Sequence, residues 1–428
     1  MPRATNHRAV RLWLLVPLIL ILFLTACTSS PAPEPSPVPK PTASPEEGQT
    51  ITLITPDAAN IDAENNAKYQ IQTRLTDFQL LSETEGLAWG VTKNSLRIYL
   101  TRDNGQTWTN ISPSPTIQFA SNPVYGKDIF FTDVKHGWMI REASGVTETV
   151  VLRTRDGGQT WNVSSLPASA SVSSIYFDSS KRGWLLSVWD GTALRENKTL
   201  FRTQDGGATW SPVMQNQDFK PGVRQTFIPV NGLTKGLAFR NARSGFAVVQ
   251  DDRLPKLYST SDGGAEWTEG PGLPPLILPG GCDRVSAGMP DFFAGTTTSG
   301  WIPLACEQGE TTAYHGVFTA DGGESWKLAS FSLRAGSGVN RSLPPTFLNA
   351  SMGWALKDDL LLHTVDQGKT WTPLPPSKVL QDKLVEYPEI VKLQFFSKEV
   401  GWLLIQKSDK RRSLLLQTTN GGVNWHVL

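Results

Sequence analysis

The chain has 428 residues, with 40 Lys and Arg, 39 Asp and Glu, a formal net charge of +1 and a hydrophobic fraction of 39%. This length allows two or three domains or one large repeat architecture. A near-neutral chain lacks the basic face that sequence-independent nucleic-acid binding needs, and the hydrophobic fraction is too low for a polytopic membrane protein. The unusual feature of the composition is the 15 Trp.

Residues 1–26 have the pattern of a secretory signal peptide. Three arginines precede an apolar run from 12 to 24, which is shorter than the ~20 residues of a membrane-spanning helix. The run ends in Leu-Thr-Ala followed by Cys27, which resembles the bacterial lipobox. The resemblance implies that Cys27 is lipidated and becomes the new N-terminus. We therefore expect a lipoprotein anchored to a bacterial cell membrane on its extracytoplasmic side.

Residues 27–50 are predicted to be the lipidated Cys followed by a disordered tether. Seven Pro fall between 28 and 50, together with Ser, Ala and Glu. Such a segment buries little apolar surface, and its prolines favour an extended chain of about 3.1 Å per residue, or roughly 70 Å in all. The remaining residues, 51–428, are predicted to form one domain.

One pattern, Thr-x-Asp-x-Gly-x-x-Trp, recurs seven times along this domain. Its third position is Asp103, Asp156, Asp205, Asp262, Asp321, Asp366 and Asn420. The pattern resembles the Asp-box, or BNR repeat, of β-propeller proteins. Asp accepts hydrogen bonds from the backbone of a tight turn, Gly allows a positive φ, and Trp anchors the hairpin. We interpret these seven residues as structural rather than catalytic.

A second landmark stands upstream of each box. It is Gly-Trp in five copies, at Gly137, Gly183, Gly300, Gly353 and Gly401, with Gly245-Phe246 and Gly86-Leu87 in the other two. A large apolar residue lies six positions before this Gly in six copies, and Ala294 is the exception. The constant offset predicts four strands per copy: strand A with the apolar residue, strand B with the landmark, strand C ending at the box and strand D starting at its Trp.

The predicted fold is therefore all-β, a seven-bladed β-propeller of four-stranded antiparallel blades. Its blades are expected to end near residues 112, 165, 213, 269, 329, 374 and 428. Residues 51–55 are expected to add a strand beside the first or last blade.

Two cysteines remain besides Cys27, and both lie in the fifth repeat. Cys282 leads into strand A, and Cys306 ends strand B. Adjacent antiparallel strands bring these ends together, and an exported protein tolerates a disulfide, so we predict the pair Cys282–Cys306. The five His show no metal-ligand spacing, and we expect neither a metal nor a cofactor.

Binding residues are expected on the top face, the end of the propeller that carries the D–A connections and the B–C turns. The longest D–A connections span 213–235, 269–290, 373–391 and 329–343, and extended B–C turns span 188–198 and 406–413. Insertions that are merely tolerated would have the same appearance.

One column near the axis contains acids. The residue nine positions before each landmark Gly is in turn Asp77, Asp128, Ser174, Gly236, Asp291, Pro344 and Lys392. Asp77, Asp128 and Asp291 suit a cation, a basic group or a general acid/base pair, although a solvated channel rim is the simpler interpretation. Only Asp77 and Asp128 lie on neighbouring blades, so a glycosidase pair is restricted to these two.

Several Asp-box families suggest different functions. Sialidases also carry an Arg-Ile-Pro element, whereas the corresponding tripeptide here, Phe227-Ile228-Pro229, has no Arg. The short blades look most like photosystem II assembly and stability factor-like propellers, which bind a membrane-protein subunit without catalysing a reaction. We therefore favour a monomeric, noncatalytic binding scaffold for a membrane or envelope protein or polymer. The alternative is a glycoside hydrolase or lyase that uses the axis carboxylates.

Overall fold

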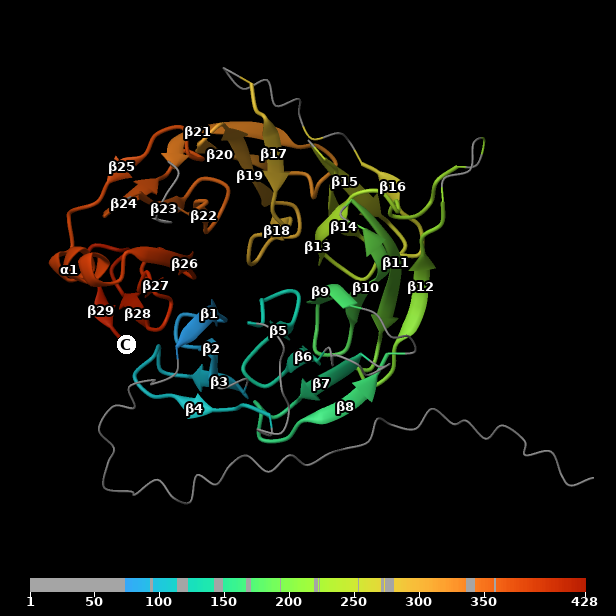
Figure 1. Cartoon of the computed structure of the whole chain (residues 1–428), viewed down its shortest axis with the longest axis horizontal. Helices are drawn as coiled ribbons and strands as arrows, with labels where there is room; N and C mark the ends of the chain where they lie inside the picture. The colour runs from blue at the N-terminus through green and yellow to red at the C-terminus, as the bar shows by residue number, and fades with distance from the viewer. Residues whose placement is uncertain are drawn as a thin grey trace, which may run out of the picture. The chain divides into compact units, whose positions relative to one another are not determined.

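The structure is a computed structural model. It describes residues 74–92, 95–113, 122–141, 149–166, 171–192, 194–218, 222, 224–252, 254–270, 273, 281–335, 343–357 and 359–428. Seven antiparallel sheets follow one another around a central axis, which confirms the predicted seven-bladed propeller (Figure 1). The signal peptide, Cys27, the tether and the strand expected at 51–55 lie outside the described residues.

Each blade is built from consecutive strands that run from the axis outward. Blades 1 to 3 consist of β1 (Leu75–Leu80), β2 (Gly86–Thr92), β3 (Ser95–Thr101) and β4 (Thr109–Asn110); β5 (Ile129–Phe131), β6 (Gly137–Arg141), β7 (Val150–Thr154) and β8 (Asn162–Ser165); and β9 (Ser171–Phe177), β10 (Gly183–Thr192), β11 (Arg195–Thr203) and β12 (Ser211–Gln215). Blades 4 and 5 consist of β13 (Leu233–Phe239), β14 (Gly245–Gln250), β15 (Pro255–Thr260) and β16 (Thr268–Glu269); and β17 (Arg284–Ala287), β18 (Asp291–Phe292), β19 (Gly300–Gln308), β20 (Thr311–Thr319) and β21 (Lys327–Ala335). Blades 6 and 7 consist of β22 (Thr346–Phe347), β23 (Gly353–Lys357), β24 (Leu360–Thr364) and β25 (Thr372–Pro373); and β26 (Glu389–Phe395), β27 (Gly401–Gln406), β28 (Ser413–Thr418) and β29 (His426–Val427).

The sequence landmarks are the contacts between blades. Trp184 of β10 stacks on Phe239 of the next blade, with ring centroids 3.7 Å apart and an interplanar angle of 2°. Phe239 in turn meets the box residue Trp267 edge-on at 6.1 Å. The Trp184 indole N–H donates to the carbonyl of Gly263 in the same box, at 2.9 Å. The same stacking joins Trp138 to Phe177 and Trp354 to Phe395. Each landmark Trp therefore fastens one blade to the turn of the next.

The Gly of the landmark is needed because the strand A aromatic ring lies over it. Gly183 pairs with Phe177 in the sheet register, and a Cβ at Gly183 would stand 2.4 Å from the Phe177 ring. Real Cβ atoms do not come that close to a ring carbon, so any larger residue would displace the ring that the preceding blade packs against. Gly137, Gly245 and Gly401 have the same relation to their aromatic partners.

Blade 5 departs from the predicted offset. Phe292, and not Ala294, pairs with Gly300, because the turn between β18 and β19 is two residues longer than in the other blades. Phe292 packs against Phe246 of blade 4, with ring centroids 5.6 Å apart. It therefore takes the position that the large apolar residue of strand A holds in the other blades. Strand A of this blade is also divided into β17 and β18, which both pair with β19.

Side chains close the ring between blades 7 and 1, because every blade is formed from its own consecutive strands. Trp402 of β27 packs against Phe78 and Trp108 of blade 1 at 5.7 and 5.6 Å. Its indole N–H donates to the Asn104 side-chain oxygen at 2.9 Å. Asn104 holds the position of the first box Gly, with a φ of 54°. The junction thus uses the same landmark Trp, but the indole bonds a side chain instead of a backbone carbonyl, and its ring is tilted by 52° against Phe78.

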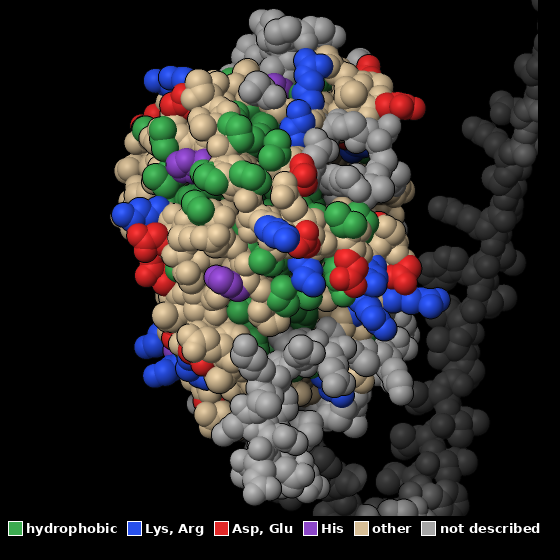
Figure 2. Space-filling model, turned by 90° about the vertical axis from the view of Figure 1, so that its left-hand side faces the viewer, with side chains coloured by type: hydrophobic (Ala, Val, Ile, Leu, Met, Phe, Trp, Pro, Cys, Tyr) green, Lys and Arg blue, Asp and Glu red, His purple; other side chains and the backbone are tan. Residues whose placement is uncertain are grey.

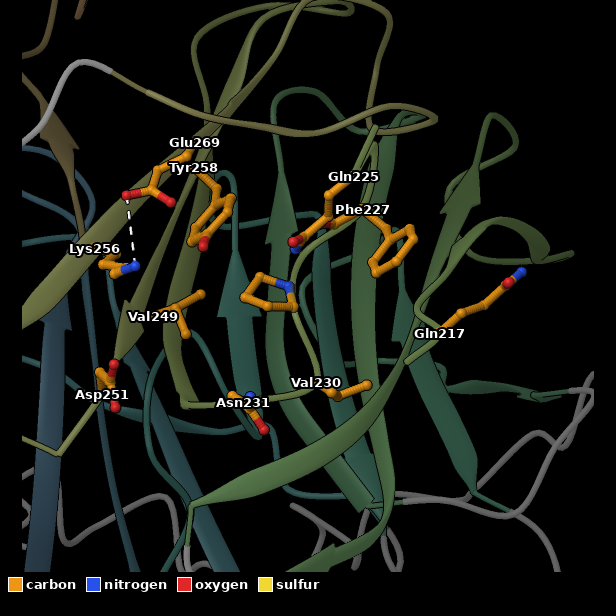
Figure 3. A pocket seen from close by; sticks show the side chains of 11 residues that line it. Gln217, Gln225, Phe227, Val230, Asn231, Val249, Asp251, Lys256, Tyr258 and Glu269 are labelled. Carbon is orange, nitrogen blue, oxygen red and sulfur yellow. Dashed lines mark hydrogen bonds and ion pairs between the residues drawn. The ribbon is translucent and has the colours of Figure 1, made fainter. Parts of the chain in front are cut away.

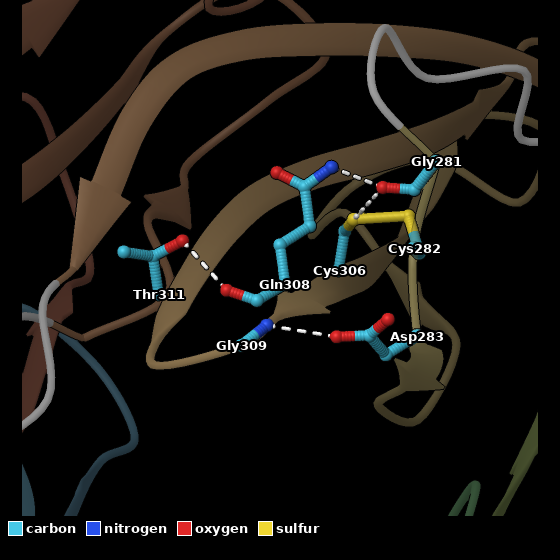
Figure 4. The surroundings of a disulfide bond; sticks show 7 residues. All are labelled: Gly281, Cys282, Asp283, Cys306, Gln308, Gly309 and Thr311. Carbon is cyan, nitrogen blue, oxygen red and sulfur yellow. Dashed lines mark hydrogen bonds between the residues drawn. A yellow bond between two sulfur atoms is a disulfide. The ribbon is translucent and has the colours of Figure 1, made fainter.

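The predicted disulfide is confirmed. Cys282 and Cys306 are bonded, with Cα atoms 5.4 Å apart, where the segment before β17 runs beside the end of β19 (Figure 4). Asp283 accepts a 2.8 Å hydrogen bond from the backbone of Gly309 in the adjoining turn. The bond fixes the part of the 269–290 connection that leads into β17.

Besides 269–290, which holds β17, two further expected connections contain regular structure. The segment 373–391 holds the helix α1 (Lys378–Glu386), in which Ser377 is the N-cap and Leu380 and Leu384 are buried. The segment 329–343 is strand as far as Ala335, because β21 extends along β20. Within the described part of the chain, no helix is long and apolar enough to cross a membrane.

Candidate functional site

The seven box residues all hold the C–D turns. Asp366 Oδ1 accepts hydrogen bonds from the hydroxyl of Thr364 and the backbone N–H of Thr370, at 2.8 and 2.9 Å. Its Oδ2 accepts a 2.6 Å bond from the Thr370 hydroxyl, and the Thr364 hydroxyl oxygen accepts from the backbone of Gly368. Equivalent bonds recur in the other boxes, including the one with Asn420. The carboxylates are occupied within their own turns.

These bonds lower the pKa of all six box aspartates. Partial burial alone would raise the pKa of Asp103, Asp156, Asp205 and Asp262, but their hydrogen bonds outweigh it. For Asp366 the bond from the Thr370 hydroxyl is the main cause and brings the pKa to about 2. Asn420 does not titrate, so the seventh box is insensitive to pH.

The propeller is therefore expected to lose stability in acid. A carboxyl whose pKa is lower in the folded chain than its ordinary value of 3.8 stabilises the fold above that value, and the contribution is lost as the pH falls toward about 2. Urea unfolding at pH 7, 5, 4 and 3 should give a fall in the free energy of unfolding between pH 4 and 3, below the range near pH 6 where the raised pKa of Asp291 acts with the opposite sign. A chain equally stable at pH 3 and pH 7 would contradict this interpretation of the boxes.

The three axis acids do not form one site. Asp77 Oδ1 lies 3.0 Å from Lys392 Nζ of blade 7 and accepts a 2.7 Å bond from the backbone of Phe78. Asp128 is buried, and its Oδ2 accepts a 2.9 Å bond from the backbone N–H of Val124, which closes the turn before β5. The two carboxylates proposed as a glycosidase pair thus have separate structural partners.

Asp291 does not align with Asp77 and Asp128. Because Phe292 takes the strand A slot of blade 5, the residue three positions earlier, Met289, occupies the column. Met289 faces two glycines of other blades: a Cβ at Gly236 would lie 2.1 Å from its Cγ, and a Cβ at Gly126 would lie 3.6 Å from its Cε. An apolar side chain therefore occupies this level of the axis.

Asp291 itself keeps an exposed side chain among the inner strands. The protein around the carboxyl limits its hydration and raises its pKa to about 6. Among the described residues, no three His, Cys, Asp or Glu side chains are grouped closely enough to hold a metal ion.

Exposed apolar side chains lie in the top-face loops of three consecutive blades. Val124 precedes β5 and is 53% exposed, and Trp189 and Leu194 stand on the β10–β11 hairpin with 42% and 46% exposure. Leu254, in the turn between β14 and β15, is 56% exposed. We call Trp189, Leu194 and Leu254 the apolar rim. Exposed apolar side chains that form a contiguous patch mark interaction sites, whereas single ones are common on protein surfaces.

The other exposed large apolar side chains among the described residues lie in blades 6 and 7 and on α1 between them: Leu360, Val365, Val379, Val385 and Val427. Val365 lies in the box of blade 6, and Val385 lies on α1. Figure 2 shows this side of the molecule, where small apolar groups are separated by polar and charged side chains.

The connection between blades 3 and 4 is anchored by a buried lysine. Lys198 of β11 is fully buried, and its Nζ donates to the carbonyls of Pro229 and Gly232, both at 2.9 Å. Glu196 Oε2 lies 3.4 Å from this Nζ and accepts a bond from the backbone of Thr234. Burial lowers the pKa of Lys198, and the Glu196 carboxylate opposes that shift.

A pocket of about 320 Å³ lies between this connection and the strands of blade 4. Figure 3 shows its two walls. One wall presents Asp251, Lys256, Tyr258, Glu269 and Val249, and the other presents Gln217, Gln225, Phe227, Pro229, Val230 and Asn231. The backbone of Gly232 donates a 2.8 Å bond to the carbonyl of Leu194, so the apolar rim adjoins the pocket.

The sequence pointed to the 213–235 connection and the 188–198 turn, but it did not identify Lys198 or the pocket residues within them. Lys198 occupies the same face of its strand as buried Leu200, two positions along. A charged residue at a buried position of a strand was the available signal. The pocket residues carry no motif.

The fold and site define the class of the protein as a seven-bladed β-propeller with a pocket at one corner of its top face. A family model described as "Sortilin, neurotensin receptor 3" matches residues 96–221. No curated protein matches the sequence.

Several solved structures are similar in fold. YCF48 from Cyanidioschyzon merolae is 17% identical over 81% of this chain and 95% of that chain, with a TM-score of 0.47. The α-L-arabinanase of Penicillium chrysogenum, solved with arabinobiose, is 13% identical over 87% and 98% of the two chains, with a TM-score of 0.40. The Nup133 β-propeller domain of Vanderwaltozyma polyspora is 10% identical over 80% and 93%, with a TM-score of 0.45. These proteins include enzymes and non-enzymes.

Proposed function

We propose that this protein is a lipid-anchored, extracytoplasmic binding scaffold that holds a protein or polymer of the bacterial envelope on its top face and catalyses no reaction. The apolar rim carries this proposal. Three large apolar side chains on adjoining blades suit an interface whose centre is dehydrated and whose surroundings are polar. The lipobox-like N-terminus and the Pro-rich tether would keep the rim within reach of envelope components.

The occupied carboxylates support a role without catalysis. A glycosidase needs two carboxyl groups that reach one bond of the substrate, with an acid and a base or nucleophile in defined roles. Asp77 is paired with Lys392, and Asp128 bonds the backbone of its own turn. These partners argue against the alternative function as a glycoside hydrolase or lyase that uses Asp77 and Asp128. The resemblance of the repeats to assembly-factor-like propellers is consistent with a scaffold.

A variant of the apolar rim tests the proposal. The full-length protein is cross-linked in its own membranes, purified in mild detergent, and its partners are identified by mass spectrometry and sugar analysis. The triple variant Trp189→Ser, Leu194→Ser and Leu254→Ser is expected to retain less than about a tenth of the captured partner, because an interface loses most of its energy with its central apolar residues.

The matched control is the double variant Val365→Ser and Val385→Ser, which removes exposed apolar side chains from other surfaces. It should capture the partner as the wild type does. Equal capture by the rim variant and the wild type, or the absence of any partner above background, would contradict the proposal.

A further inference from the structure

The pocket beside the apolar rim has the size of a small-ligand site. Its volume of about 320 Å³ is at the lower end of the range of roughly 300–1,000 Å³ for such sites. The strands β14, β15 and β16 form one wall, and the connection from Gln225 to Asn231 forms the other. This space suits one or two rings of a polar ligand.

The walls of the pocket are held in place before any ligand arrives. Lys198 binds the carbonyls of Pro229 and Gly232, and the backbone of Glu196 donates a 2.8 Å bond to Val230. On the opposite wall Tyr258 is almost fully buried. A site whose walls are already ordered loses little conformational entropy on binding.

The pocket holds one ammonium group and two carboxylates. Lys256 Nζ lies 3.6 Å from Glu269 Oε1, and Asp251 adds one further negative charge. Two carboxylates disfavour a phosphate or another anion, and the neighbouring ammonium group disfavours a cation at Glu269. The balance is suited to a neutral ligand.

The remaining groups both donate and accept hydrogen bonds. No described residue bonds the side-chain amides of Gln217 and Asn231, and Gln225 uses only its Nε2, which donates to the Phe227 carbonyl at 3.1 Å. Burial and the Glu269 carboxylate raise the pKa of Tyr258 to about 12, so its phenol remains protonated at neutral pH. The phenol is hydrogen-bonded to Glu269, which leaves the three amides and the Asp251 carboxylate to satisfy hydroxyl groups, each of which is a donor and an acceptor.

Apolar surface accompanies these polar groups. Phe227, Pro229 and Val249 line the same pocket, and Trp189 stands on the neighbouring hairpin. A sugar ring presents C–H groups on its faces and hydroxyl groups around its edge, and this pocket offers the complementary arrangement.

From these observations we propose that the pocket between Gln225–Asn231 and Asp251–Glu269 binds a neutral saccharide unit, one or two rings long, of an envelope glycan. This inference rests on the proposed function, because it names the chemistry of the ligand at the same corner of the top face.

Saturation-transfer NMR on the full chain tests the inference. The probes are chitobiose, cellobiose, maltose, lactose and mannobiose. A Lys-Arg-Lys tripeptide represents the alternative class of ligand, a cationic peptide. At least one disaccharide is expected to receive saturation and the tripeptide none. The double variant Gln225→Ala and Asn231→Ala should bind that disaccharide at least tenfold more weakly than the wild type. Gln215→Ala, an exposed amide of β12 outside the pocket, should bind like the wild type.

Three results would overturn the saccharide site: no disaccharide in the panel binds, the tripeptide binds instead, or the double variant binds as well as the wild type. If the double variant fails to fold, Asn231→Ala replaces it, since that side chain is exposed. The capture experiment separates this failure from failure of the scaffold. If capture of the partner depends on the apolar rim but no disaccharide binds, only the saccharide site is rejected. If a disaccharide binds but no partner is captured, only the scaffold function is rejected.

Discussion

Replacing Trp184 with Ala is expected to lower the free energy of unfolding by about 3–5 kcal/mol, the usual range for deleting a buried Trp. The indole is fully buried, stacks on Phe239 and donates a hydrogen bond to Gly263. The substitution would therefore open a cavity between blades 3 and 4 and leave a carbonyl unpaired. Urea unfolding followed by circular dichroism measures the change.

Trp189→Ala is the matched control, because it removes the same side chain from the same strand, where it is 42% exposed. Its effect should be less than about 1 kcal/mol, as for most surface substitutions. If the two variants were equally stable, the stacked aromatic columns would not be what joins the blades.

Lys198→Met should destabilise the chain by about 3–5 kcal/mol, the range expected when one member of a buried ion pair is removed. The substitution preserves the apolar length of the side chain but removes the donor to Pro229 and Gly232. It also leaves the Glu196 carboxylate without its cation. Because the same contacts shape the pocket, the variant should also lose disaccharide binding. Urea unfolding and saturation-transfer NMR on one preparation measure both effects.

Two further variants give this prediction its controls. Lys256→Met removes a lysine whose side chain is 47% exposed, and it should change stability by less than about 1 kcal/mol. Glu196→Gln combined with Lys198→Met should recover part of the lost stability, because no buried charge then remains unpaired. A double variant less stable than Lys198→Met alone would show that Glu196 and Lys198 do not act as a pair.

The fold was predictable because each landmark residue makes one particular contact, and that contact fixes its distance along the chain from the other landmarks of its blade. Trp184 must reach Phe239 of the next blade, and Gly183 must leave room for Phe177. Because Phe177 and Gly183 pair in the sheet, and their counterparts do so in the other blades except blade 5, the two positions keep a constant offset along the chain. Blade count and strand order follow from that offset.

The predicted positions were wrong in blade 5, where Ala294 in place of a large apolar residue was the available signal. A turn two residues longer moved Asp291 out of the axis column and placed Met289 there. The helix α1 was missed because it has only nine residues and lies within a segment expected to be irregular. Its signals are the N-cap Ser377 and the buried pair Leu380 and Leu384.

The candidate site was predictable only as a region. The two long segments of blade 3 were selected by their length, but the pocket depends on contacts between residues far apart in the chain, such as Lys198 with Gly232. Spacing rules within one repeat carry no information about such contacts. The axis acids attracted attention because they share a column, yet Asp77 and Asp128 each have a structural partner.

The central claim is that the corner formed by the tops of blades 3 and 4 contacts an envelope partner. Site-specific photo-cross-linking in living cells tests it most directly, with a benzophenone amino acid at Thr192 of the β10–β11 hairpin and, as control, at Val365 of the blade 6 turn. We predict a discrete adduct from position 192 and none from position 365. An adduct from position 365 with none from position 192 would contradict the account.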